Sequence, residues 1–492
     1  MMKSIRNCQV IPFDDVPCTS FDSFRKELAQ EINTNKKRIL AFFPVAENGE
    51  TYRLIAVVGG ADGLLCGSTA VEKEYPSLTP EIPALHWFER ELHEQYGIIP
   101  REHPWLKPIR FHNEHTEPAV TDYFRMQGDA VHEVAVGPIH AGVIEPGHFR
   151  FQCMGEKVYS LEISLGYQHR GIEKMILDPA SVRNLPLMET AAGDSSAAAS
   201  TVYARLVETF AGIKTPGKAE IFRQIAVELE RIANHVGDLG ALSGDVAYLP
   251  TASFCGRIRG DYLNLTAELC GNRFGRGINN YGGVRHSIDS VLRKRIREKL
   301  TVIYKELQHA LDLMFDSPTV LDRFENTGTV QNETARRIGL TGPAGRASGL
   351  DVNALRDFPC PGQSSFPEPI SGAELTGDVM ARAKVRYAEI KAAHKWLFQV
   401  LDSEDCEQQS SGTRVPPELC KNAFAVSITE AWRGDYCCCA VTDQNGKFRR
   451  CTIVDPSFHN WFGLAMSLRN EEISNFPICN KSFNLSYCGH DL

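Results

Sequence analysis

The chain has 492 residues, of which 43% are hydrophobic, and it carries a formal net charge of −8. About 150 residues per domain predicts two or three domains, each able to bury a core. The acidic balance, without any basic block, argues against nucleic acid as a partner, because nucleic-acid binding requires clustered Lys and Arg side chains.

The first 115 residues predict a small α+β domain. Residues 22–34 have helical spacing, 39–60 contain two β-rich runs, and 84–98 are again helical. Residues 116–130 are polar and aperiodic, which is typical of a linker. We therefore predict an N-terminal domain at 1–115 and a linker at 116–130.

The remaining residues, 131–492, predict a mostly helical domain with peripheral β-structure. Short strands are expected across 131–166. Long helices are expected at 219–240, 287–316 and 380–402, where apolar residues recur every three or four positions. The chain returns to β-rich runs after residue 422. The predicted fold class of the whole chain is α+β.

Neither a signal peptide nor a membrane span is expected. The N-terminus reaches acidic residues before any apolar run, and no segment approaches ~18 uncharged apolar residues. The fifteen cysteines are therefore interpreted as reduced thiols of a cytosolic protein. The run Cys437-Cys438-Cys439 is interpreted as small strand residues rather than as a ligand set, because alternate side chains of a strand point to opposite faces.

A specific motif ends the first domain. Trp87-Phe-Glu-Arg-Glu-Leu-His-Glu-Gln-Tyr-Gly-Ile98 is followed by His103-Pro-Trp-Leu-Lys-Pro-Ile109. Together they resemble the signature of the C-type subunit of NADH-quinone oxidoreductase, respiratory complex I. The alternative is an ordinary amphipathic helix whose acidic side chains, Glu89, Glu91 and Glu94, lie in solvent.

The second domain carries further motifs in a fixed order. They are Gly137-Pro-Ile-His140, Glu145-Pro-Gly-His-Phe-Arg-Phe151, Gly166-Tyr-Gln-His-Arg-Gly-Ile-Glu-Lys174, Glu228-Leu-Glu-Arg-Ile-Ala-Asn-His235 and Gly342-Pro-Ala-Gly-Arg-Ala-Ser-Gly349. These resemble the D-type large subunit shared by complex I and the group 4 [NiFe] hydrogenases. The order of C-type before D-type in one chain is similar to the hydrogenase 4 family.

This resemblance implies where nickel ligands would lie, since active [NiFe] hydrogenases carry two CxxC pairs. Here Ala192 and Ser195 occupy the first pair of positions, and Ser457 and Asn460 the second. Thiolates bind nickel because sulfur is anionic and polarisable, whereas alanine offers no donor and serine and asparagine offer hard or weak ones. The sequence contains no CxxC at any other place. We therefore expect this chain to bind no metal and no cofactor of its own.

The small residues around Asp194 are interpreted as the walls of a cavity that has lost its metal centre. If the fold of the family holds, polar residues converge on it: Glu145, Asp194, Ser195, Asp455 and His459, with Glu189 and Arg346 nearby. A solvated polar cavity and a site for a harder cation are alternatives. The resemblance implies a proton path through Glu145, with a structural EPG turn as the alternative, and a quinone headgroup near His140 and His148.

The Gly166–Lys174 motif implies a second feature. In relatives this loop faces the [4Fe–4S] cluster of the small subunit, so His169 and Arg170 are expected to face a cluster that the partner holds. The implied partners are a B-type iron–sulfur subunit, a ferredoxin-like subunit, and antiporter-like and quinone-module membrane subunits that pump protons. The chain is expected at the cytoplasmic face of the inner or plasma membrane, attached through partners. It would pass electrons to quinone or another acceptor, or serve only as an assembly scaffold.

Overall fold

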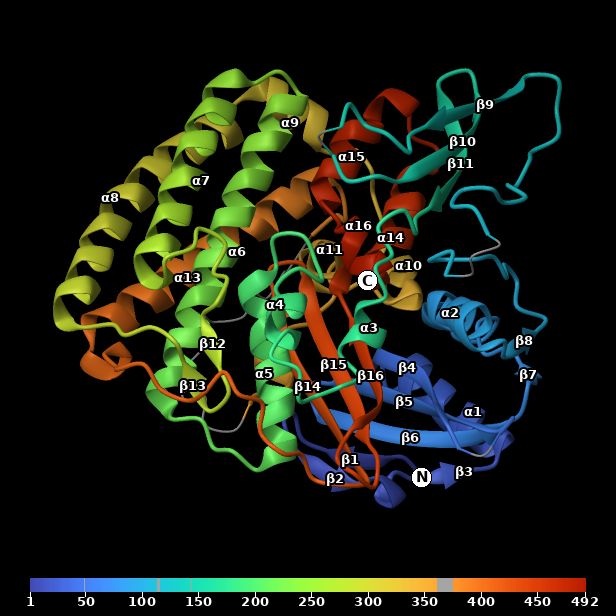
Figure 1. The fold of residues 1–492 in the computed structure, drawn as a ribbon. Helices are drawn as coiled ribbons and strands as arrows, with labels where there is room; N and C mark the ends of the chain where they lie inside the picture. The colour runs from blue at the N-terminus through green and yellow to red at the C-terminus, as the bar shows by residue number, and fades with distance from the viewer. Residues whose placement is uncertain (48, 113–115, 143, 361–374) are drawn as a thin grey trace.

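The structure is a computed structural model that describes residues 1–47, 49–112, 116–142, 144–360 and 375–492. It contains long helices and several small antiparallel sheets, which confirms the α+β class. Figure 1 shows the long helices gathered on one side of the molecule and the N-terminal sheet on the other.

The N-terminal region is a five-stranded sheet with two helices. Its order is β1-β6-β5-β4, and β3 pairs with β6 in parallel. The elements are β1 (Lys3–Ile5), β3 (Cys18–Thr19), α1 (Phe21–Ala29), β4 (Arg38–Ala46), β5 (Tyr52–Gly60), β6 (Gly63–Val71) and α2 (His86–Tyr96), with a π-helical turn over Gln30–Thr34 after α1. The expected helices and β-rich runs of this region are confirmed.

The acidic side chains of α2 do not lie in solvent as the amphipathic alternative required. Glu89 is fully buried and accepts hydrogen bonds from the backbone nitrogens of Leu78 and Thr79. Glu91 forms an ion pair with Arg110, which is also buried. The helix thus organises the loops on both sides of it through its carboxylates, because buried carboxylates require partners.

Residues 116–130 form no helix or strand, as expected for a linker. A three-stranded antiparallel sheet follows, in the order β11-β10-β9. Its strands are β9 (Val131–Val136), β10 (His148–Met154) and β11 (Lys157–Ser164), which confirms the strands expected across 131–166.

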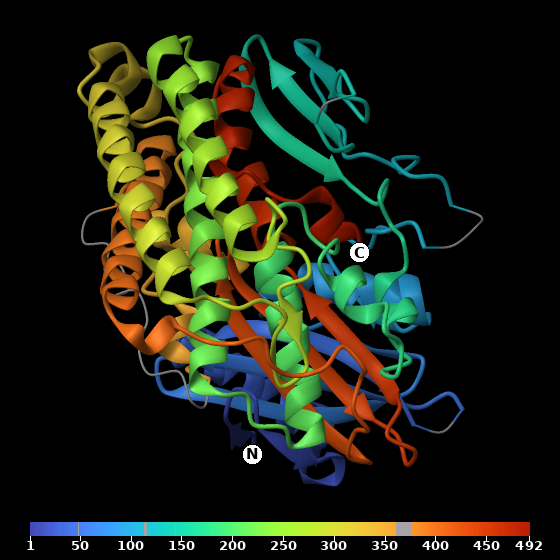
Figure 2. The same cartoon turned by 60° about the vertical axis from the view of Figure 1, so that its left-hand side comes forward.

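Long helices form the body of the second region, and Figure 2 shows several of them side by side. They are α5 (Ser196–Ala211), α6 (Gly217–Asp245), α7 (Leu249–Cys270), α8 (Ser290–Phe315) and α13 (Val379–Asp402). The three helices expected from apolar periodicity correspond to α6, α8 and α13. Apolar side chains of α6 are almost completely buried, which explains why its periodicity is so regular.

The two regions share a sheet. Its order is β16-β15-β14-β2, made of β2 (Val10–Pro12), β14 (Ala423–Ala431), β15 (Gly434–Thr442) and β16 (Phe448–Val454). The three C-terminal strands confirm the expected β-rich tail. Strand β2 comes from the N-terminal region, so the ends of the chain are joined by backbone hydrogen bonds.

The C-terminal segment forms α14 (Pro456–Ser467), α15 (Phe476–Phe483) and α16 (Tyr487–Asp491). Aromatic contacts join α14 to α2, including Phe88 with Phe458 at a centroid distance of 4.9 Å. Short elements complete the fold: β7 (Glu74–Pro76), β8 (Ile99–Arg101), α3 (Ile172–Met175), α4 (Asn184–Met188), β12 (Asn279–Asn280), β13 (Gly283–Val284), α9 (Pro318–Phe324), α10 (Asn332–Ile338), α11 (Gly342–Ala347) and α12 (Ala354–Asp357). Within the described residues, no helix has the length and apolar content needed to cross a membrane.

Arg38 of β4 joins the two regions and generates a stability prediction. Its guanidinium contacts Asp357 at 2.9 Å and also pairs with Asp435, and both aspartates are buried. Burial alone would raise the pKa of Asp435, but Arg38 holds it below its ordinary value. Arg38→Met should lower the free energy of unfolding by about 3–5 kcal/mol, because it leaves the buried carboxylate of Asp435 without its guanidinium partner and leaves Asp357 paired with Arg356 alone.

Chemical unfolding of the wild type and the variant measures this loss. The matched control is Arg25→Met, which removes an exposed pair with Glu81 at 2.9 Å and should cost less than about 1 kcal/mol. Equal losses in the two variants would contradict a bridging role for Arg38.

Candidate functional site

Three segments that are far apart in the sequence meet beside the N-terminal end of α5. They are the loop before α5, the loop between β9 and β10, and the turn between α15 and α16. The hydroxyl of Ser486 accepts a hydrogen bond from the backbone nitrogen of Gly193 at 2.9 Å. The backbone nitrogen of Tyr487 donates to a carboxylate oxygen of Glu145 at 3.2 Å. The turn before α16 therefore holds both loops in place.

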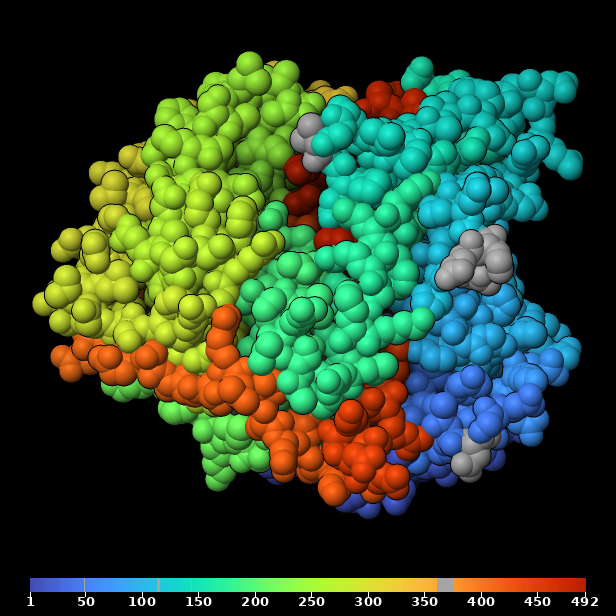
Figure 3. Space-filling model, viewed as in Figure 1, coloured from blue at the N-terminus to red at the C-terminus, as the bar shows by residue number. Residues whose placement is uncertain are grey.

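A cavity of about 810 Å³ adjoins this junction. Figure 3 shows a hollow between the helices (yellow-green) on one side and the teal part of the chain on the other, with C-terminal residues (red) inside it. It is lined by Ile144, Glu145, Gly193, Asp194, Asn234, Gly237, Asp238, Gly240, Ala241, Gly244, Ala252, Gly256, Arg259, Arg433, Lys481, Asn484, Leu485 and Tyr487. This volume is large enough for a small organic ligand.

The helical wall of the cavity consists of small residues. Gly237, Gly240 and Gly244 of α6 and Gly256 of α7 face the space. At Gly240 a Cβ atom would lie 2.6 Å from the Cβ of Cys255, so only glycine permits this approach of α6 and α7. Because glycine has no side chain, space remains in front of the backbone of these helices.

The other walls carry charges of both signs. Asp194 lies 3.5 Å from Arg259, and about half of its side chain is exposed. Asp238 is buried and accepts a hydrogen bond from Arg386 at 2.8 Å. Arg433 donates to the carbonyl oxygen of Gly193 at 2.7 Å. These charges have partners within the protein, so a ligand of this cavity meets a polar wall whose charges are already balanced.

Asp194 has a left-handed backbone conformation with φ of 57°. Its carbonyl oxygen accepts hydrogen bonds from the amide of Asn234 at 2.9 Å and from the indole of Trp432 at 3.0 Å. These two bonds compensate for a conformation that residues other than glycine rarely adopt. The backbone at Asp194 is fixed, whereas its carboxylate reaches the cavity.

The four positions expected to correspond to nickel ligands carry no thiol. The hydroxyl of Ser457 accepts a hydrogen bond from the backbone nitrogen of Ser486 at 2.9 Å. The amide of Asn460 bonds both the nitrogen and the oxygen of the Thr341 backbone, at 3.0 and 3.2 Å. Ala192 offers no donor atom, and among the described residues no three His, Cys, Asp or Glu side chains are grouped as metal ligands. These residues do not fit a thiolate-bound nickel–iron centre.

Three buried polar atoms next to these positions have no hydrogen-bond partner among the described residues. They are the hydroxyl oxygen of Ser195, one carboxylate oxygen of Asp455 and the phenol oxygen of Tyr436. The other oxygen of Asp455 accepts from the backbone nitrogen of Ser457 at 2.8 Å, and burial raises the pKa of this carboxyl. Unpaired buried polar atoms are typical of sites that bind water or a polar ligand.

Two segments of the sequence match known protein families. Residues 57–128 match the family described as the respiratory-chain NADH dehydrogenase 30 Kd subunit, and residues 245–418 match the 49 Kd subunit. Formate hydrogenlyase subunit 5 of Escherichia coli K12 is 29% identical over 446 residues, which cover 85% of this chain and 77% of that protein. The chain thus carries a segment that matches the 30 Kd subunit family and, after it, a segment that matches the 49 Kd subunit family.

Two further relatives have the same general character. Hydrogenase-4 component G of Escherichia coli K12 is 26% identical over 441 residues, covering 85% of this chain and 76% of its own. The C/D subunit of NADH-quinone oxidoreductase from Acinetobacter baumannii strain AYE is 25% identical over 363 residues, covering 67% of this chain and 61% of its own. The chain is thus similar both to hydrogenase subunits and to a quinone oxidoreductase subunit.

His140 in the β9–β10 loop and His148 at the start of β10 hold this loop rather than line the cavity. His140 lies 2.9 Å from the carbonyl oxygen of Gly147, and His148 lies 3.3 Å from that of Gly137. Neither is among the residues that line the cavity within the described chain. Burial lowers the pKa of His148, which favours its neutral form. Both rings stabilise the turn that carries Glu145.

His459 and Arg346 lie away from the cavity. The ring of His459 faces Phe88 of α2 at a centroid distance of 5.7 Å, and burial lowers its pKa to about 4. Arg346 forms buried ion pairs with Glu389 at 2.6 Å and Glu430 at 2.8 Å. Neither is among the residues that line the cavity in the described part of the chain.

Glu189 anchors a neighbouring loop. Its carboxylate accepts a hydrogen bond from the backbone nitrogen of Gly277 at 2.6 Å, and burial raises its pKa. It is not among the described residues that line the cavity. Its contact joins the start of the loop before α5 to the segment that follows α7.

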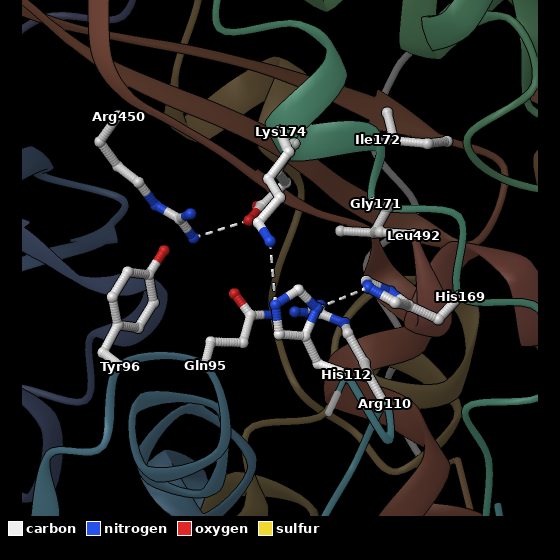
Figure 4. Close-up of a pocket in the computed structure, with 11 residues that line it drawn as sticks. Gln95, Tyr96, Arg110, His112, His169, Gly171, Ile172, Lys174, Arg450 and Leu492 are labelled. Carbon is white, nitrogen blue, oxygen red and sulfur yellow. Dashed lines mark hydrogen bonds and ion pairs between the residues drawn. The ribbon is translucent and has the colours of Figure 1, made fainter. Parts of the chain in front are cut away.

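The loop of His169 and Arg170 lies at the junction with the N-terminal region, beside a pocket of about 60 Å³ (Figure 4). His169 lies 2.8 Å from the carbonyl oxygen of Asp491 and 3.0 Å from His112, which in turn lies 3.1 Å from Lys174. Because a carbonyl only accepts, His169 donates there through Nδ1 and accepts from His112 through Nε2. Partial burial and then Lys174 lower the pKa of His112.

Arg170 points to the loop before α5. Its guanidinium donates to the carbonyl oxygen of Thr190 at 2.8 Å and remains exposed. Three residues separate Thr190 from Asp194 in the cavity wall. The loop that the resemblance associates with an iron–sulfur cluster is therefore hydrogen-bonded to the loop that lines the cavity.

Glu230 is a site residue that sequence reasoning missed. Its buried carboxylate accepts hydrogen bonds from the backbone nitrogens of Ala197 and Ala198, at 2.6 and 3.3 Å, at the N-terminal end of α5. Burial, together with the charge of Asp194, raises its pKa to about 8. The available signal was its place in the Glu228–His235 motif.

Glu230 generates a prediction about pH. The folded protein binds the proton of this carboxyl more tightly than the unfolded chain does, where the pKa is near 4.5. The contribution of Glu230 to stability therefore falls as pH rises from about 4.5 to about 8. Relative to Glu230→Gln, the wild type should lose on the order of 4 kcal/mol over this range.

The free energies of unfolding of the wild type and of Glu230→Gln, measured from about pH 4.5 to about pH 8, test this prediction. The exposed residue Glu325 provides the control, because Glu325→Gln removes one charge without touching a buried group. Its curve should run parallel to that of the wild type. Parallel curves for wild type and Glu230→Gln would show that Glu230 does not hold a proton near neutral pH.

Proposed function

We propose that the chain is the large subunit of a membrane-attached oxidoreductase complex, with a nickel-free cavity in which an acceptor receives electrons from an iron–sulfur partner. The acceptor is quinone or another small polar molecule. The observation that carries this proposal is an open cavity of about 810 Å³ lined by Gly193 and Asp194, which lie between two of the four ligand positions that lack thiols. The four positions themselves, Ala192, Ser195, Ser457 and Asn460, are buried and are not among the described residues that line the cavity.

The electron route is supported by the contact between Arg170 and the loop before α5. A [4Fe–4S] cluster held by the partner would supply the one-electron carrier. Arg170 is exposed, so its positive charge is available to a partner, and charge beside a cluster stabilises its reduced form. The bond to Thr190 links that surface to the cavity wall.

Protons needed by the acceptor would come from carboxyl groups of this chain. Glu145 and Asp194 line the cavity, and Glu230 lies behind Asp194. Carboxyl groups within reach of a bound acceptor are suited to general acid–base work. His140 and His148 would act by positioning the loop that carries Glu145.

Assembly is supported by the names of relatives. The membrane-bound hydrogenase subunit alpha of Pyrococcus furiosus is 27% identical over 370 residues, covering 72% of this chain and 85% of its own. We propose the same setting here: a B-type iron–sulfur subunit, a ferredoxin-like subunit and proton-pumping membrane subunits, with this chain on the cytoplasmic face of the membrane. The alternative is a non-catalytic scaffold of that complex.

Metal analysis of the complex tests the nickel-free cavity. The complex is purified through a tag on this chain from gently solubilised membranes, and iron, nickel and hydrogen uptake are measured together. Iron without nickel, and no hydrogen uptake, are expected because the four positions offer no thiolate. Stoichiometric nickel would show that the cavity holds a metal in a manner that its side chains do not suggest.

The variant Asp194→Asn distinguishes a redox role of this chain from a role as an assembly scaffold. The change removes a cavity charge and keeps the side-chain shape, so the complex should assemble while electron transfer from reduced ferredoxin to a quinone falls at least ~10-fold. Asp129→Asn, in the exposed linker, is the matched control. Unchanged electron transfer in an assembled Asp194→Asn complex would favour the scaffold.

A further inference from the structure

Two thiols far apart in the sequence touch each other outside the cavity. The sulfur atoms of Cys8 and Cys360 lie 3.3 Å apart, although 352 residues separate them in the chain. Cys8 precedes β2, and Cys360 follows α12. Closing this distance to a disulfide bond length of about 2.05 Å requires only a small movement of the two sulfurs.

The pair is reachable from outside. Both cysteines line a pocket of about 430 Å³, together with Arg205, Glu220 and the loop after α5. Cys8 is half-buried, whereas Cys360 is buried at the inner end of the contact. A small molecule that enters this pocket meets both sulfurs.

The surroundings make the two thiols unequal. The amide of Asn7 donates a hydrogen bond to the sulfur of Cys360 at 3.2 Å. The hydrogen bond from Cys8 and the positive charge of Arg205 lower the pKa of Cys360. The same hydrogen bond, together with burial, raises the pKa of Cys8. Of the two thiols, Cys360 is therefore the one whose thiolate form is favoured, and the thiolate is the nucleophilic form of cysteine.

We propose that Cys8 and Cys360 form a reversible thiol–disulfide pair that reacts with small organic disulfides. The thiolate of Cys360 attacks one sulfur of the reagent, forms a mixed disulfide and releases one thiolate. Cys8 then gives up its proton and attacks the sulfur of Cys360, which releases the second thiolate of the reagent. The organic disulfide is reduced to two thiols while the two cysteines are oxidised to one disulfide.

The disulfide would join the two regions of the chain covalently. The backbone nitrogen of Cys8 donates to the carbonyl oxygen of Val426 on β14 at 2.9 Å, so Cys8 is already held against the shared sheet. Asn7 also donates to the carbonyl oxygens of Phe358 and Ile428, at 2.7 and 2.9 Å. These bonds keep both partners in place before oxidation.

The chain contains a matched control pair. Cys438 and Cys451 lie on neighbouring strands with their sulfurs 3.8 Å apart, and both are fully buried in the sheet. Their separation is similar to that of Cys8 and Cys360, but neither lines the described pocket. If proximity alone determined reactivity, both pairs would form disulfides.

The experiment uses the reduced full-length chain in a Cys18→Ser background, because Cys18 is exposed and would react independently. 4,4′-Dithiodipyridine is added at neutral pH, and release of thione is followed by absorbance. Peptide mapping without reduction should identify a Cys8–Cys360 link, which dithiothreitol removes. Cys8→Ser should stop at a stable pyridyl adduct on Cys360, and Cys360→Ser should slow the reaction of Cys8 at least ~10-fold.

The Cys438–Cys451 pair should remain unmodified in the folded protein. Stable adducts on both Cys8 and Cys360 without a link, or a link that forms no faster than one at Cys438–Cys451, would overturn the proposal. Circular dichroism verifies that each variant folds. If Cys360→Ser does not fold, the wild-type map and the Cys8→Ser adduct still decide the outcome.

Discussion

The cavity depends on one buried serine. The hydroxyl of Ser486 accepts hydrogen bonds from the backbone nitrogens of Gly193 and Gly489, and its own nitrogen donates to Ser457. One residue thus satisfies backbone groups of the loop before α5 and of α16, and binds the first turn of α14. Since unsatisfied buried backbone groups are costly, these bonds favour the joint formation of the three segments. The cavity-lining residues Gly193 and Tyr487 lie in segments that this junction holds.

The four positions that the resemblance associates with nickel ligands carry neutral side chains, Ala192, Ser195, Ser457 and Asn460. The charges of the cavity wall are balanced by side chains of the protein itself, such as Asp194 by Arg259. Ser457 and Asn460 form hydrogen bonds within the fold, which gives both a structural role. The hydroxyl of Ser195 has no hydrogen-bond partner among the described residues.

The sequence predicted long periodic elements well and non-local contacts poorly. Apolar periodicity located α6, α8 and α13, but α5 begins with small residues and carries no clear apolar stripe. The pairing of β2 with β14 joins residues more than 400 positions apart, which no local pattern encodes. His459 was expected in the cavity with Ser457, yet two residues on a helix differ by about 200° in direction, so the ring faces α2 instead. Asn460 lies about 60° from Ser457 and shares its side.

The movable part of the cavity is a side chain rather than a loop. The carbonyl oxygen of Asp194 is held by Asn234 and Trp432, and its left-handed backbone has few other conformations available. Its carboxylate, by contrast, is half exposed and only 3.5 Å from Arg259, which is a loose pair. A change of charge in the cavity would therefore rotate this carboxylate before it displaced the loop. Glu230 lies behind it with a pKa raised to about 8 by burial and by the charge of Asp194, so removal of that charge would lower the proton affinity of Glu230.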